Sequence, residues 1–288
     1  MPVTAPGVWD EVGDGAWRRR FESMHLNIGV VRGSDALLVV DSRESHRRAR
    51  ELRDEIRLLS PLPVRWVVNT HWHWDHTFGN HVLASPPDEA ELWGHETVPG
   101  LLAALGDSVR RKVTDQLPDL AEDMAELVVT PPDHLVTTVE TIDLGDRGVE
   151  LRFLGRGHTN GDLVVVAADA GAVFAGDLIE ESDPPYFGID SFPLDWPLTA
   201  GTLADQVGDA TVVPGHGAVV DHAFCVEQRA SLAQVAALIH ELHDAGIAAD
   251  DALAEGGDRW PWPGDVLEDA VQRGYAALDG KDLDPRLL

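Results

Sequence analysis

The segment from residue 64 to residue 76 reads VRWVVNTHWHWDH, in which an apolar run leads into a cluster of histidines and an aspartate. The first part, residues 64–69, predicts a short buried strand. His71 and His73 are two residues apart, so in extended backbone their rings point to the same side and can hold one metal ion. Asp75 and His76 follow where a helix is expected to begin, and the bend directs them to a second position nearby. The segment therefore predicts a metal site at the end of a strand.

Three other predicted strands also end just before a candidate metal ligand. Residues 149–154 precede His158, residues 172–175 precede Asp177, and residues 211–213 precede His216. Because sites in layered α/β sheets form at the carboxyl ends of strands, we expect these side chains to converge. His158 is expected to complete the first site and His216 the second, while the Asp177 carboxylate can bridge both ions.

The predicted ligands are imidazole nitrogens and carboxylate oxygens, a combination suited to zinc. They are His71, His73, Asp75, His76, His158, Asp177 and His216. With three or four protein ligands for each ion, room remains for a shared water, which is typical of a catalytic site. We predict two Zn²⁺ per chain, with iron and manganese as alternative metals.

Strands and helices alternate along the chain, which indicates a layered α/β fold. Residues 27–32 and 35–41 predict a hairpin through Gly33-Ser34, and residues 44–60 predict an amphipathic helix. Residues 97–134 predict a helical insertion packed beside the site.

The last part of the chain is expected to be helical. Residues 226–245 and 265–278 predict two helices, the first of which ends at Gly246. We therefore divide the chain into a catalytic domain, residues 1–225, and a short helical C-terminal extension packed on it, residues 226–288.

Four motifs follow one another along the chain: NTHWHWDH at 69–76, GHTNGD at 157–162, AGD at 175–177 and PGHG at 214–217. In this order they resemble the signature motifs of the metallo-β-lactamase superfamily, over roughly residues 24–222. The resemblance implies a four-layer αββα sandwich with the metals at one edge of the two packed sheets. It places Asp41 where the family has a structural acid, and Asp177 makes the metal site similar to that of glyoxalase II.

Composition narrows the classes of partner. The formal net charge of −28 repels phosphate backbones and anionic lipid headgroups, so we expect neither nucleic acid nor membrane as a partner. Met1–Arg20 has no apolar stretch, which indicates no signal peptide, and the single cysteine, Cys225, excludes an intramolecular disulfide. We therefore expect a cytoplasmic enzyme that acts on a small molecule. The sequence does not determine the oligomeric state, and a homodimer is one option.

The family resemblance implies hydrolysis by a hydroxide that bridges the two ions. Asp75 is expected to bind one ion and orient the hydroxide, Asp177 to set the distance between the ions, and Tyr186 to donate to the developing oxyanion. Trp74, Tyr186, Phe187 and Trp196 are the aromatic candidates for the pocket lining. Thr159 and Asn160 are expected to support His158, and Arg273 and Tyr275 are candidate substrate contacts.

The aspartate at position 177 also bears on the subfamily. The β-lactamases of this superfamily usually have cysteine or serine there, whereas aspartate is similar to glyoxalase II, lactonases, arylsulfatases and RNA-processing nucleases. The acidic surface disfavours the nucleases. The expected reaction is hydrolysis of a small ester, thioester, lactone or related bond. The alternatives are a mononuclear-iron oxidoreductase similar to persulfide dioxygenases, a β-lactamase-active member of the same fold, and a non-catalytic binding member.

Overall fold

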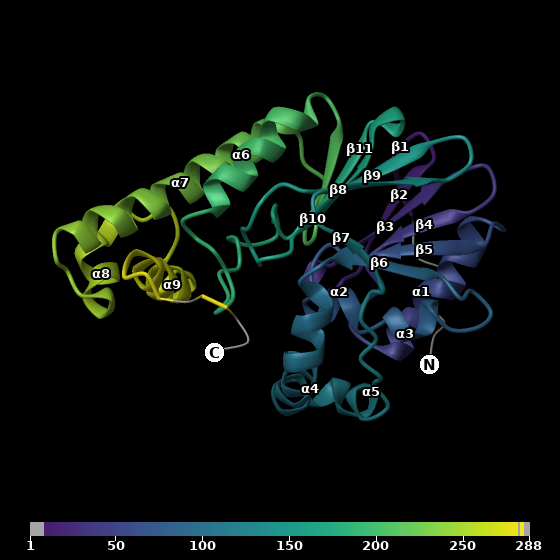
Figure 1. Ribbon diagram of the computed structural model, residues 1–288, viewed down its shortest axis with the longest axis horizontal. Coiled ribbons are helices and arrows are strands. Elements are labelled where there is room, and N and C mark those ends of the chain that lie inside the picture. Colours follow the sequence, from purple (N-terminus) through teal and green to yellow (C-terminus); the bar gives the residue numbers. More distant parts are fainter. Residues whose placement is uncertain (1–8, 282, 285–288) are drawn as a thin grey trace.

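The computed structural model describes residues 9–281, 283 and 284 of the chain. Two β-sheets pack face to face and helices cover the outer face of each, which gives four layers (Figure 1). The expected αββα sandwich is therefore confirmed, with helices following it at the C-terminal end. The prediction of no signal peptide in Met1–Arg20 depends in part on residues 1–8, which lie outside the described residues.

The first sheet has seven strands in the order in which they occur along the chain. They are β1 (Asp10–Gly13), β2 (Ala16–Arg20), β3 (Asn27–Arg32), β4 (Leu37–Val40), β5 (Val64–Val68), β6 (Glu91–His95) and β7 (His134–Val136). The strands from β1 to β4 are antiparallel, whereas β4 to β7 run parallel. The predicted hairpin is β3–β4, in which Val31 lies opposite Leu38.

The second sheet has five strands in the order β12-β11-β10-β9-β8. They are β8 (Val139–Asp143), β9 (Gly148–Phe153), β10 (Leu163–Ala167), β11 (Ala172–Gly176) and β12 (Thr211–Pro214). β11 and β12 are parallel, and the other neighbours are antiparallel. The central strands are apolar throughout because both of their faces are covered.

Apolar side chains fill the space between each pair of layers. Between the two sheets, Leu38 and Val68 of the first pack with Val165 and Phe174 of the second. On the outer face of the first sheet lie α1 (His46–Leu59) and α3 (Asn80–Leu83), and on that of the second lie α6 (Trp196–Val207) and α7 (His222–Asp244). This packing fixes the position of one sheet on the other, so that strand ends of both sheets lie along the same edge of the sandwich.

The segment 97–134 contains α4 (Val98–Gln116) and α5 (Ala121–Ala125), joined by the 3-10 helix η2 (Pro118–Leu120). An apolar cluster packs α4 and α5 against Trp72 and Phe78, which flank α2 (Trp74–Thr77). The helical segment therefore lies beside the predicted metal ligands, as expected.

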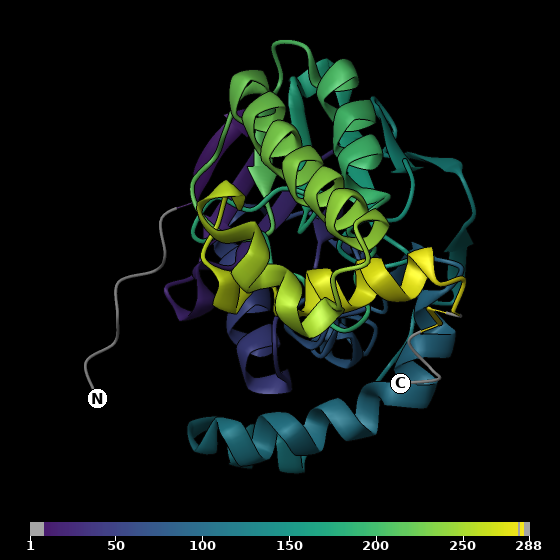
Figure 2. The same cartoon turned by 90° about the vertical axis from the view of Figure 1, so that its left-hand side faces the viewer.

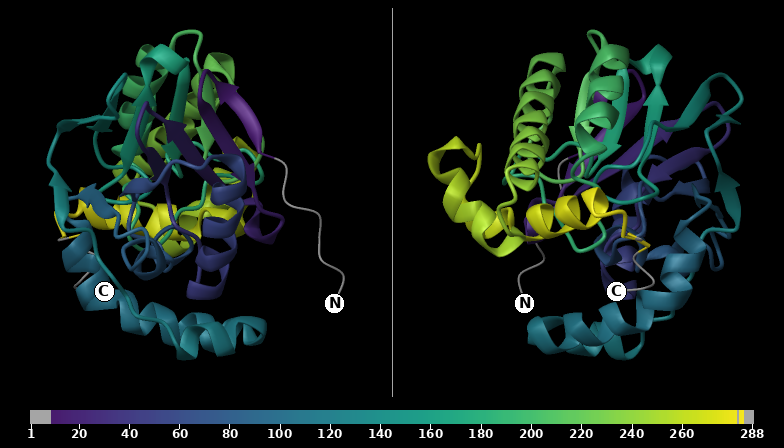
Figure 3. Two further views of the ribbon diagram at one scale, coloured as in Figure 1. Left: turned by 90° about the vertical axis from the view of Figure 1, so that its right-hand side faces the viewer. Right: turned by 60° about the vertical axis from the view of Figure 1, so that its left-hand side comes forward.

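The C-terminal helices α8 (Ala249–Gly256) and α9 (Glu268–Leu278) pack on α7, and α9 crosses beside the end of α7 (Figures 2 and 3). Gly246 adopts a φ of 74° directly after α7, as expected of a residue that ends a helix. α7 itself starts at His222, so the division at residues 225 and 226, which stays a prediction, would fall in its first turn. The remaining 3-10 helices are η1 (Ser23–His25), η3 (Ala168–Ala170), η4 (Gly257–Arg259) and η5 (Gly264–Val266).

Several elements were not anticipated from the sequence. β2 contains three consecutive arginines and is only half-buried near the sheet edge, so its strand pattern is weak. α6 contains Pro197 and Gly201, which obscure a helical pattern, although Pro197 lies in the first turn where proline is tolerated.

Within the described residues, no helix has both the length and the apolar character required to cross a membrane.

The packing predicts that Gly79→Ala destabilises the fold. A Cβ at Gly79 would lie 1.8 Å from the Ser42 carbonyl oxygen and 2.8 Å from the Ala49 Cβ, both in rigid surroundings. We expect the free energy of unfolding to fall by about 1–3 kcal/mol, measured by urea denaturation. Gly264→Ala is the control, because its nearest neighbour lies at 4.0 Å. Equal stability of the two variants would contradict this packing.

Candidate dinuclear metal centre

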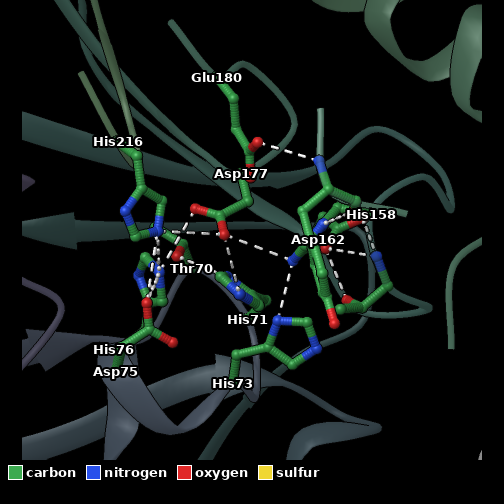
Figure 4. A network of polar contacts seen from close by, with 12 residues as sticks. Thr70, His71, His73, Asp75, His76, His158, Asp162, Asp177, Glu180 and His216 are labelled. Carbon is green, nitrogen blue, oxygen red and sulfur yellow. Dashed lines mark hydrogen bonds and ion pairs between the residues drawn. The ribbon is translucent and has the colours of Figure 1, made fainter. Parts of the chain in front are cut away.

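All seven predicted ligands meet at one edge of the sandwich (Figure 4). The segment after β5 provides four of them, and the segments after β9, β11 and β12 provide one each. The expected convergence of four strand ends is confirmed. Two groups form: the first is His71, His73, His158 and Asp177, and the second is Asp75, His76 and His216.

The first group surrounds a point beside Asp177. His73 Nδ1 and His158 Nε2 are 2.9 Å apart. The Asp177 Oδ2 atom lies 3.4 Å from His158 Nε2 and 3.6 Å from His71 Nε2. Each member thus directs one potential ligand atom toward the same small volume.

The second group lies on the other side of the same carboxylate. His76 Nε2 and His216 Nε2 are 3.3 Å apart, and Asp75 Oδ2 is 3.4 Å from the first and 3.3 Å from the second. Asp177 approaches both, at 3.3 Å from His76 and 3.5 Å from His216. Asp177 therefore borders both groups, the position that a bridging ligand requires.

These separations fit zinc. Tetrahedral ligands at the usual zinc distances are about 3.3 Å from one another, close to the spacing of the facing atoms. Among the described residues, the enclosed atom His71 Nε2 has no hydrogen-bond partner. A buried polar atom without a partner is costly, so this atom points to a ligand that the protein does not itself provide.

The ring nitrogen of each histidine that faces away from the cluster has a polar partner, which fixes the ring and its tautomer. The pairs are His71 Nδ1 with Thr70 Oγ1 at 3.1 Å, His73 Nε2 with Asp190 Oδ2 at 3.0 Å, His76 Nδ1 with Asp41 Oδ2 at 2.8 Å, His158 Nδ1 with the Tyr186 carbonyl at 3.0 Å and His216 Nδ1 with the Met24 carbonyl at 2.7 Å. In this arrangement each inward nitrogen keeps its lone pair for a metal.

Asp41 occupies the structural role expected of it. Its carboxylate accepts from the Thr70 amide at 2.8 Å and from the Thr70 hydroxyl at 2.9 Å, in addition to His76. Since the Thr70 hydroxyl donates to Asp41, its oxygen is free to accept from His71. One buried carboxylate thus orients a ligand of each group.

At His73 of the first group burial acts to lower the pKa, but Asp190 outweighs it and raises that pKa. Burial sets the protonation of the other two histidines. It lowers the pKa of His71 well below its usual value and that of His158 to about 4, so both rings are neutral, as a metal ligand must be. Burial alone would raise the pKa of a carboxyl. At Asp75 and Asp177 the neighbouring histidines, His76 foremost and then His216, outweigh it, and both pKa values lie well below the usual range.

The second group attracts positive charge. Burial acts to lower the pKa of His76 and His216, but the carboxylates of Asp177 and Asp75 outweigh it and raise both pKa values well above the usual value. Two ionised carboxylates in a buried pocket therefore favour a cation between them.

Two contributors to the site were not predicted from the sequence. Asp190 accepts from Trp72 Nε1 at 2.8 Å as well as from His73. Burial opposes the ionisation of Asp190, but His73 brings its pKa to about 2.

Glu180 is buried near Asp177, and burial together with the Asp177 charge raises its pKa well above the usual value. A Glu180 oxygen accepts from the Tyr186 amide at 3.0 Å, which ties down the loop beside the site. Asp190 lies in no motif, so no local signal marked it, whereas Glu180 closely follows Asp177.

The expected support of His158 by Thr159 and Asn160 takes a different form. The Thr159 amide and hydroxyl donate to Asp162, which shapes the turn after His158, while the ring of His158 is held by the Tyr186 carbonyl. Burial raises the pKa of Asp162 to about 7. The enclosed Asn160 Oδ1 has no hydrogen-bond partner among the described residues.

A cavity of about 1040 Å³ opens onto the cluster. Of the aromatic candidates, Trp74, Tyr186 and Phe187 line it. The prediction for Trp196 was wrong: this side chain is fully buried in the core, where it packs beside His158 and donates to the Leu178 carbonyl at 3.2 Å.

The proposed substrate contacts at Arg273 and Tyr275 were also wrong. Both side chains are buried, and neither lines the cavity. Arg273 instead donates from Nε to the Ser191 carbonyl at 2.8 Å. Because Ser191 follows Asp190, this contact lets α9 support the loop that orients His73.

The family model of the metallo-beta-lactamase superfamily matches residues 25–216, and the chain belongs to this superfamily. It is 25% identical over 203 residues to a metallo-beta-lactamase type 2 from Bacillus cereus, over 69% of this chain and 70% of that protein. It is 26% identical over 149 residues to a linear primary-alkylsulfatase from Pseudomonas sp. (strain ATCC 19151). That match spans 43% of this chain and only 28% of the alkylsulfatase.

Solved structures show the same fold. A metallo-beta-lactamase from Pontibacter korlensis superposes with a TM-score of 0.63 at 21% identity, over 79% of this chain and 99% of that one. A double mutant of the sec-alkyl sulfatase PisA1 superposes with a TM-score of 0.76 at 14% identity, over 98% of this chain and 51% of that one. The second match therefore extends over the C-terminal helices.

The contacts of Asp190 predict that Asp190→Asn weakens one of two metal sites. Loss of the charged acceptor leaves His73 less firmly oriented, so we expect the affinity for one zinc ion to fall by about 10–100-fold. Competition with a chromogenic chelator measures this. Asp169→Asn, in a turn at the other end of the sheet, is the matched control. Two unchanged affinities in Asp190→Asn would show that Asp190 does not position the ligand.

Proposed function

We propose that this protein is a dinuclear zinc hydrolase that cleaves a small ester, thioester, lactone or related bond. The observation that carries the proposal is the position of the Asp177 carboxylate, 3.3 to 3.6 Å from imidazole nitrogens of both ligand groups. A carboxylate so placed can bind two ions at once, and such pairs are typical of hydrolytic sites.

Two bound zinc ions would acidify a water molecule and polarise the bond to be cleaved. In this proposal the protein holds the two ions and orients the attacking water. His71, His73 and His158 would hold the first ion, and Asp177 would keep the two ions together. Asp75, whose pKa is low despite burial, serves as an ionised acceptor that orients the attacking water.

The relatives support the general reaction, since the names alkylsulfatase and β-lactamase both denote enzymes that hydrolyse a bond of their substrate. The aspartate at position 177 favours ester-type substrates over β-lactams, because β-lactamases of the superfamily usually have cysteine or serine there. The dioxygenase alternative keeps the same histidine motif and binds one iron through a subset of the ligands, so the metal content separates it from a zinc hydrolase. Elemental analysis of protein purified without chelators distinguishes these alternatives: two zinc ions support hydrolysis, and one iron ion supports oxidation.

Removal of a ligand tests the proposal. We expect His73→Ala and Asp177→Ala to lose bound zinc and to lower kcat/KM for chromogenic esters by at least about 100-fold, because a ligand matters more than its supporting partner. Circular dichroism should show that both variants remain folded. His240→Ala, an exposed histidine on α7, serves as the control. Full activity in either ligand variant would exclude the proposed metal chemistry.

Tyr186 is proposed to donate to the developing oxyanion. Its side chain lines the cavity, and partial burial against the cavity walls together with negative neighbours raises its pKa, so the phenol stays protonated. We expect Tyr186→Phe to lower kcat by about 10-fold or more with little change in zinc content. An unchanged kcat would assign the phenol no part in the reaction.

A further inference from the structure

The cavity beside the metal centre is enclosed by segments far apart in the chain. One wall is α4, another is the 182–190 loop, and a third is formed by residues 265–269 at the start of α9. The walls reach down to His73, Asp75, Asp177 and His216. Its volume of about 1040 Å³ lies at the upper end of the range for small-molecule sites. The cavity therefore has room for a substantial group attached to the bond that is cleaved.

The α4 wall has an apolar stripe beside the polar side chains of Ser108, Lys112 and Gln116. Leu105, Val109 and Val113 recur every four residues and so form one stripe along the helix, and Leu117 follows at its end. Val113 is almost fully buried, whereas Leu117 is 42% exposed. The stripe thus runs from the protein core into the open part of the cavity.

The opposite wall also exposes large side chains. Tyr186 and Ile189 are each 58% exposed, and Pro184 and Val266 line the cavity with them. Exposed apolar side chains gathered around a concave surface are typical of a site for an apolar ligand. A ligand that covers both walls would remove this surface from water.

The charges around the cavity are mainly negative. Outside the metal centre and its support, the acidic side chains in the lining are Asp183, Asp265, Glu268 and Asp269. Among the described lining residues, Lys112 on α4 is the sole lysine or arginine. An anionic group in this part of the cavity would be repelled more than it is attracted.

We infer that this cavity holds an uncharged, apolar part of the substrate, so that the preferred substrate is a neutral ester, thioester or lactone with a hydrocarbon or aromatic group. The inference rests on the proposed hydrolytic function and defines its substrate class. Repulsion by the acidic lining selects against substrates that carry a carboxylate or sulfate at the far end.

The test compares nitrophenyl esters with one leaving group and different acyl chains. From acetate to octanoate, kcat/KM should rise roughly three- to fourfold per methylene until the cavity is filled. Nitrophenyl hexanoate should be preferred at least about 10-fold over mono-nitrophenyl adipate, which has the same acyl length but ends in a carboxylate. A kcat/KM independent of chain length, or a preference for the adipate, would overturn the inference.

Substitutions in the cavity walls test which side chains contact the substrate. Ile189→Ser should lower kcat/KM for the octanoate roughly 10-fold while changing that for the acetate less than about twofold. Leu198→Ser is the matched control, since Leu198 is 72% exposed on α6 and outside the cavity. The double variant Asp265→Asn with Glu268→Gln should raise kcat/KM for the adipate about three- to tenfold and leave that for the hexanoate unchanged. Equal effects of Ile189→Ser on the acetate and the octanoate would contradict the assigned wall.

Binding provides a readout that does not depend on catalysis. Calorimetry with the full chain as purified should detect octanamide, with weaker binding of suberamic acid and weaker binding of octanamide to Ile189→Ser. Failure to bind octanamide would overturn the substrate inference and leave the proposed function intact. Octanamide binding without hydrolysis of any ester, thioester or lactone would instead overturn the proposed function.

Discussion

The Asp177 carboxylate, buried between two groups of imidazoles, is the constraint on which the rest of the site depends. Burial disfavours its charge, and the histidines around it compensate by holding its pKa low. The same charge raises the pKa values of His76 and His216 above their usual value. Burying the Asp177 and Asp75 carboxylates costs free energy unless positive charge lies between them, and a pair of divalent ions would provide that charge.

The fold provides this arrangement at the ends of strands. β11 delivers Asp177 and the parallel neighbour β12 delivers His216, while β5 of the other sheet delivers the histidine-rich segment. Close approach of the two loops depends on Gly215, where a Cβ would lie 1.8 Å from Asp177 Oδ1. The ligands are therefore correctly placed only when the two sheets pack on each other in their final relative position. Folding of the core and formation of the site are coupled for this reason.

Much of this was predictable because the ligands lie in local motifs at strand ends. The spacing of His71 and His73 implied a shared ion, and apolar runs such as Val64–Val68 located the strands before them. Asp190 could not be found in this way, since it meets His73 across 117 residues through a loop that has no periodic pattern. Arg273 and Trp196 were misassigned because residue type does not distinguish a side chain that lines a pocket from one buried behind it. The placement of α6 also depends on tertiary packing: this helix carries a proline and a glycine, and its position follows from the sheet that it covers.

The walls of the cavity that lie away from the metal centre are expected to determine which substrates this site accepts. Members of a superfamily can share a metal centre and differ in substrate because other segments decide what reaches it. In this protein those segments are α4, the 182–190 loop and the start of α9. The loop both lines the cavity and, through Asp190, orients His73, so in the proposed function one structural element would serve both substrate binding and metal binding.

The most direct test of a bridged pair of ions is anomalous X-ray scattering at the zinc edge from crystals of the protein as purified. We expect two zinc maxima roughly 3.5–4 Å apart, one on either side of the Asp177 carboxylate. A single maximum, or maxima away from Asp177, would contradict this arrangement.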